Sequence, residues 1–179
     1  MKGFIFTGFL EMVEEKYGFV VVDNVLKNSQ LSTGGVYTAV GTYPFDELVG
    51  LVVSLSKEVN TPPNLLLKVF SHYFFEIIKV KYTPFFEKAV DTFEMFEKLD
   101  SYIHPEVKKL YPQADLPKFD ATRVTQNTLE LIYSSDKMMA DFAEGLMEKC
   151  AEYFQEDITI ERTNLDEEGK KVRFLIIRE

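Results

Sequence analysis

The residues of this sequence that could carry chemistry are few, and the two histidines come first. His72 lies in the aromatic run 70–74, where a partly buried structural histidine is the favoured interpretation. His104 is flanked by the apolar Ile103 and Val107, and such a histidine alone is more often a core residue than a metal ligand. The sequence patterns of zinc peptidases, dinucleotide-binding proteins and serine hydrolases are absent. We therefore expect no enzyme, and a carboxylate-based hydrolase is the weakest hypothesis.

A second group of polar residues strengthens the case for His104. Tyr133, Ser135 and Lys137 are spaced so that an extended chain would place all three on one side. Two hydroxyl groups and one ammonium group suit a pair of carboxylates. Neutral imidazole is the usual axial ligand when haem is held through one protein bond, and haem carries two propionate carboxylates. Together with an apolar slot, which 16 Phe and 9 Tyr residues could line, these groups indicate a haem site.

Hydrophobic periodicity predicts how the chain positions these groups. Helices are expected before Gly18, over 20–28, over 46–59, after Pro63, from Asp91 and again near Ser101. Strands are expected over 123–125, 128–134, 157–163 and 172–177, with a helix over about 136–155 between the two pairs. The predicted fold class is therefore α+β: a mostly helical N-terminal part followed by a four-stranded antiparallel sheet.

Charge and composition exclude several classes of protein. The formal net charge of −9 repels phosphate backbones, so nucleic-acid binding is not expected. The lone Cys150 excludes an internal disulfide and a cysteine-based zinc site, and we expect a buried, inert thiol. No cleavable leader is recognisable, and the longest apolar stretch, 48–55, is far shorter than the ~18–20 residues of a membrane helix. We expect a soluble, cytoplasmic protein.

Several motifs, in one order and at compatible spacing, resemble a known family. They are Ile103-His104-x-Glu106-Val107-x-Lys109-Leu110-Tyr111-Pro112, then Leu116-Pro117, then Tyr133-x-Ser135-x-Lys137, supported by the segments 1–6, 35–38 and 142–146. The sequence resembles the haem–nitric oxide/oxygen binding (H-NOX) domain over essentially its whole length. The resemblance implies one haem b domain over 1–179, with a helical subdomain over 1–62, a haem-ligating subdomain over 63–179, and haem between them.

The resemblance also implies roles for individual residues. His104 would be the proximal iron ligand, and Tyr133, Ser135 and Lys137 would hold the propionates. Ile5 and Pro117 would press on the haem plane and distort it. Phe9, Phe74 and Phe142 match distal positions, and Leu146, in the same motif as Phe142, is a further candidate haem contact.

From these roles we expect a gas sensor with a particular selectivity. Bound O₂ gains about 1–3 kcal/mol from a distal hydrogen-bond donor, whereas NO and CO depend far less on one. Phenylalanine at positions 9, 74 and 142 supplies no donor, so we expect NO and CO binding without a stable O₂ complex. The resemblance implies that NO releases the iron–His104 bond and that a separate effector, a sensor histidine kinase or a diguanylate cyclase, receives the signal, since the chain leaves no room for one. The alternative is a non-haem α+β domain that binds a small ligand or a protein.

Two residues depart from the family pattern. Lys137 stands where the motif has arginine, so a planar fork becomes a single point charge. Pro105 follows His104 directly, which predicts that His104 is biased away from helical geometry and that the iron–histidine bond is strained differently.

Overall fold

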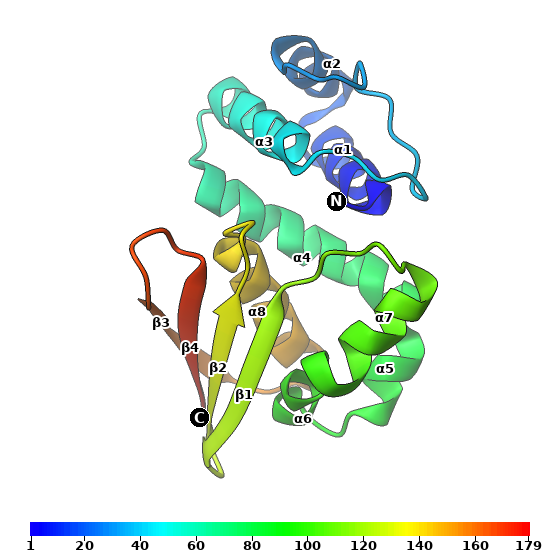
Figure 1. Cartoon of the computed structure of the whole chain (residues 1–179). Coiled ribbons are helices and arrows are strands. Elements are labelled where there is room, and N and C mark those ends of the chain that lie inside the picture. Colours follow the sequence, from blue (N-terminus) through cyan, green and yellow to red (C-terminus); the bar gives the residue numbers. More distant parts are fainter. The chain divides into compact units, whose positions relative to one another are not determined.

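Helices α1 to α4 build the first of two units into which the chain divides, Met1–Ile77. The computed structural model describes all residues from 1 to 179. The helices are α1 (Gly3–Tyr17), α2 (Phe19–Asn28), α3 (Phe45–Val59) and α4 (Pro63–Lys81), the last continuing into the second unit (Figure 1). Gly18 ends α1 with φ of 90°, a conformation that glycine adopts without steric cost. These bounds lie close to the predicted helices.

Aromatic packing explains why the first part of α4 belongs to this unit. The ring of Phe9 on α1 meets the ring of Phe70 edge-on, with centroids 5.2 Å apart, and Phe70 lies 5.6 Å from Phe74. Gly8 allows α1 to approach α4 closely, because a Cβ atom at this position would lie only 3.2 Å from the side chain of Ile77. The division between the units therefore falls inside α4, after Ile77.

A buried carboxylate holds the segment between α2 and α3. Glu47, only 4% exposed, accepts hydrogen bonds from the hydroxyls of Ser32, Thr33 and Tyr37 and from the backbone N–H of Thr33. Burial alone would raise the pKa of Glu47, but the bonds from Ser32, Tyr37 and Thr33 outweigh it and lower the pKa to about 2. The segment 29–43, predicted to be irregular, is thus ordered by one side chain of α3.

We expect Glu47 to make stability depend on acid pH. Because its folded pKa lies below the unfolded value of 4.5, its contribution is complete above pH 4.5 and is lost as the pH falls toward about 2. Glu47→Gln should lower the free energy of unfolding by roughly 1–3 kcal/mol at neutral pH, and by less near pH 3. Urea unfolding at both pH values measures this difference. Glu58→Gln, at an exposed carboxylate that accepts from Asn24, is the control, and an equal loss at both pH values would contradict the assignment.

The second unit, Ile78–Glu179, combines short helices with a sheet. After the end of α4 come α5 (Thr83–Lys88), α6 (Thr92–Glu97), the π-helix η1 (Leu99–Ile103) and α7 (His104–Leu110). The sheet contains β1 (Lys118–Thr125), β2 (Thr128–Ser134), β3 (Ile158–Asn164) and β4 (Lys171–Arg178), with α8 (Ala140–Phe154) inserted after β2. All neighbours pair antiparallel in the order β1-β2-β4-β3, and α6 lies beside β1 (Figure 1). The π-helix η1 also contacts β1. The predicted α+β class is confirmed.

Local chemistry sets several of these bounds. Asp91 caps α6 by accepting from the backbone N–H of Glu94 at 2.7 Å, and the Glu94 carboxylate reaches back to the N–H of Val90 at 2.7 Å. Helix α8 begins later than predicted, because the chain turns at Met138 with a positive φ of 49°.

Cys150 on α8 is buried, and burial raises the pKa of its thiol, as expected for an inert cysteine. No helix of the structure has the length and apolar character needed to cross a membrane.

Candidate functional site

His104 is held by a carboxylate one turn before it. Its Nδ1 lies 2.8 Å from Oδ1 of Asp100, while the other oxygen of Asp100 accepts the backbone N–H of Phe119 at 2.9 Å. Burial lowers the pKa of His104, although the charge of Asp100 and its hydrogen bond raise it. A neutral imidazole whose Nδ1 proton points at a carboxylate keeps the lone pair of Nε2 for a metal. Asp100 therefore selects the tautomer and the ring orientation that an iron ligand requires.

The backbone before His104 takes an unusual form. The π-helix η1 spans the five residues immediately before it, and the N–H of His104 donates to the carbonyl of Leu99. His104 itself is helical, with φ of −61° and ψ of −40°, so the predicted bias away from helical geometry by Pro105 is wrong. In a regular α-helix the Pro105 ring would clash with the carbonyl of Ser101, and the wider π turn relieves this clash. At the kink or fresh start predicted near Ser101, the structure has a π-helical turn that passes directly into α7.

Tyr133 connects the sheet to the region of His104. Its ring is 1% exposed and packs edge-on against Phe119 at 5.5 Å between centroids, and Phe119 lies 5.9 Å from the ring of His104. The Tyr133 hydroxyl accepts the N–H of Met139 at 2.9 Å. Burial raises the pKa of Tyr133, which opposes the lowering by hydrogen bonds with Ser135 and Met139, so the hydroxyl keeps its proton at neutral pH.

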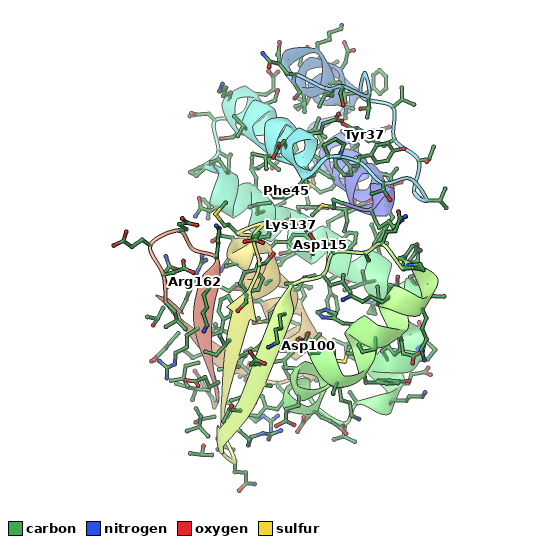
Figure 2. All side chains as sticks on the ribbon, in the orientation of Figure 1. Tyr37, Phe45, Asp100, Asp115, Lys137 and Arg162 are labelled. Carbon is green, nitrogen blue, oxygen red and sulfur yellow. The ribbon has the colours of Figure 1, made fainter.

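Ser135 and Lys137 follow β2 in a turn and not in an extended strand. The strand ends at Ser134, and the N–H of Lys137 donates to Oγ of Ser135 at 3.2 Å. The Lys137 ammonium group binds the carboxylate of Asp115, in the segment between α7 and β1 (Figure 2). A turn therefore brings the Ser135 hydroxyl to the Tyr133 hydroxyl and to the N–H of Lys137, where the sequence predicted an extended chain. The ammonium group of Lys137 lies on Asp115.

The remaining predicted residues lie on both units. Ile5 and Phe9 are on α1 and Phe74 is on α4, all in the first unit, where Phe9 is fully buried and Phe74 stacks on Phe4 at 5.5 Å. In the second unit, Pro117 is half-buried directly before β1. Phe142 and Leu146, one helical turn apart on α8, are also half-buried.

The residues of the second unit fit a histidine-ligated haem. A half-buried imidazole held in one orientation is the kind of donor that haem iron takes from a protein. The ammonium group of Lys137 already binds a carboxylate, so it can also bind a haem propionate. The neighbouring hydroxyl groups of Tyr133 and Ser135 can donate hydrogen bonds to a second carboxylate. Fold and site together define a haem-binding α+β domain.

Comparison with known proteins identifies the family. The family model described as "HNOB: Haem-NO-binding" matches residues 2–162, so the chain belongs to the haem-NO-binding, or H-NOX, family and haem is its cofactor. This match confirms the resemblance inferred from the sequence. It supports a gas-binding domain over an enzyme, and it rules out the non-haem alternative. A comparison with curated proteins found no match.

Solved H-NOX structures match the whole chain. The Fe(II) unliganded protein from K. algicida is 38% identical with a TM-score of 0.96, and 100% of this chain and 97% of that chain are covered. The protein from Shewanella woodyi, in the Fe(II)CO ligation state and bound to IWP-051, is 40% identical, with a TM-score of 0.86 and coverage of 100% and 95%. The protein from S. oneidensis in the Fe(II)NO ligation state is 27% identical, with a TM-score of 0.91 and coverage of 100% and 99%.

Three contacts at the site were not predicted from the sequence. They involve Asp100, Phe119 and Asp115, which touch His104, Tyr133 and Lys137 respectively. The four-residue spacing of Asp100 and His104 on a helix was a usable signal for the first of them. The other two contacts join residues far apart in sequence, and no local pattern announces them.

Proposed function

We propose that the chain is a ferrous-haem sensor of NO that also binds CO and forms no stable O₂ complex. The haem iron would supply the position at which the gas binds. The contact that carries the proposal is the one between Asp100 and His104, because it leaves Nε2 of a neutral imidazole as the proximal ligand. NO and CO ligation states of the S. oneidensis and Shewanella woodyi proteins support these two gases as ligands.

The proposed selectivity follows from the residue types at the distal positions. Phe9, Phe74, Phe142 and Leu146 carry no N–H or O–H on their side chains. O₂ would therefore lose the hydrogen bond worth about 1–3 kcal/mol that a polar distal residue would provide. NO and CO depend much less on such a donor, so an apolar lining favours them.

For signalling, we propose that release of His104 from its ligand position is the trigger. His104 is the first residue of α7 and directly follows η1, so its release would first change the positions of these two elements. The change would also reach β1, because Asp100 of η1 accepts a hydrogen bond from its residue Phe119. A separate effector, a sensor histidine kinase or a diguanylate cyclase, would receive the change. Tyr133, Ser135 and Lys137 would hold the propionates, and Ile5 and Pro117 would press on the haem plane.

Absorption spectra of the reduced protein test the gas selectivity. We expect a strong haem band under anaerobic conditions that shifts with CO and with NO and stays unchanged in air until slow oxidation sets in. A stable oxygenated spectrum would contradict the selectivity while leaving the haem site intact. A protein that gives no haem band, even after haem is added, would contradict the proposed site itself.

A further inference from the structure

The ammonium group of Lys137 already binds a carboxylate of the protein itself. Its Nζ donates to the side chain of Asp115 and lies 3.4 Å from the backbone carbonyl of the same residue. The two partners differ in exposure, because the Lys137 side chain is 14% exposed and that of Asp115 is 80% exposed. Figure 2 shows both residues, on the β2–α8 connection and on the segment before β1. A carboxylate of the protein itself thus occupies the position beside Lys137 at which a carboxylate ligand would bind.

The ammonium group of a lysine has three N–H donors, but two carboxylates that share its single charge lie close together and repel each other. Its charge is compact, whereas the planar fork of arginine presents five donors and can bind carboxylates on separate edges. A haem propionate at Lys137 would have to displace Asp115 or share a single ammonium group with it, next to a second negative charge. Displacement is easily achieved, because an ion pair with an exposed carboxylate contributes little.

We propose that Asp115 competes with a haem propionate for Lys137 and so weakens haem retention. The inference rests on the proposed role of Lys137 at the propionates. When the propionate takes the ammonium group, Asp115 is set free in the solvent. The segment between α7 and β1, which also contains Pro117, then loses its tie to the β2–α8 connection. Asp115 thus lowers the affinity of this chain for haem.

Transfer of haem from the oxidised holoprotein to excess apomyoglobin measures retention directly. We expect Asp115→Asn to slow haem loss about two- to fivefold, the range that corresponds to a surface ion pair. Asp136→Asn is the matched control: its carboxylate is 97% exposed, it precedes Lys137 in sequence, and its removal changes the net charge equally. Haem loss from Asp115→Asn that is unchanged, faster, or slowed only as much as in Asp136→Asn overturns the proposal.

A second pair of variants tests whether the effect passes through Lys137. Lys137→Met should speed haem loss, and adding Asp115→Asn to it should change nothing further, because the contested group is gone. An undiminished effect of Asp115→Asn in the Lys137→Met protein overturns the competition. If Lys137→Met retains haem like the unmodified protein, the proposed propionate role of Lys137 fails instead, and the gas spectra remain an independent test of NO binding.

Discussion

Replacing His104 by glycine should abolish the response of η1 and α7 to NO. In the intact protein, His104 is the first residue of α7 and is linked through Asp100 to the start of β1, so the release that we propose would change the restraint on all three elements. In the glycine variant these elements are no longer restrained by an iron ligand, whichever gas is bound. Hydrogen exchange of the amides over 99–110, with and without NO, measures the response, and we expect the NO-dependent difference to vanish.

Imidazole provides the control for this variant. Added imidazole restores the iron ligand without restoring its covalent link to α7, so the haem spectrum should recover while hydrogen exchange stays independent of NO. The half-buried His72 on α4 supplies a matched substitution, His72→Gln, which should keep the full NO-dependent difference. An NO-dependent exchange difference that persists in His104→Gly without imidazole would show that the trigger lies elsewhere.

The helical part of the fold was readable from the sequence because its signals are local. Gly18 ends α1, and Asp91 with Glu94 caps α6, and each depends on residues within one turn. Strand β1 was underestimated, since only Phe119 of its eight residues is buried and the strand lacks the alternation that marks a half-buried strand. Helix α5 was not predicted, because six residues give too short a periodic pattern.

The candidate site was recognised by residue types, whereas its arrangement depends on tertiary contacts. His104 and Tyr133 were identified from motifs, but the ring of Phe119 that packs between them comes from a strand start that the sequence did not predict. Pro105 was expected to disturb His104, and the π turn of η1 absorbs the proline instead. Such a turn is a property of the whole α6–α7 connection and has no short sequence signature.

Removing the charge of Asp100 should loosen the haem more than any other single change outside the ligand itself. An asparagine has only one acceptor oxygen, so it can serve Nδ1 of His104 or the N–H of Phe119 but not both. The donor left over then faces an amide NH₂ group, another donor. Partners of this kind behind a metal ligand typically change affinity or activity 10- to 100-fold. We expect Asp100→Asn to speed haem transfer to apomyoglobin by at least about tenfold and to lower the iron–histidine stretching frequency in resonance Raman spectra.

These two measurements separate the electronic role of Asp100 from a purely structural one. A carboxylate behind Nδ1 increases the electron density that the imidazole donates, so its loss weakens the iron–histidine bond even where the fold is intact. Asp120→Asn, on β1 next to Phe119 and paired with Lys118 at an exposed position, makes the same chemical change without touching His104. It should leave both the transfer rate and the stretching frequency unchanged. A lowered frequency in Asp100→Asn alone would place Asp100 in control of the bond whose release we propose as the signal, whereas an unchanged frequency with faster haem loss would restrict it to anchoring β1.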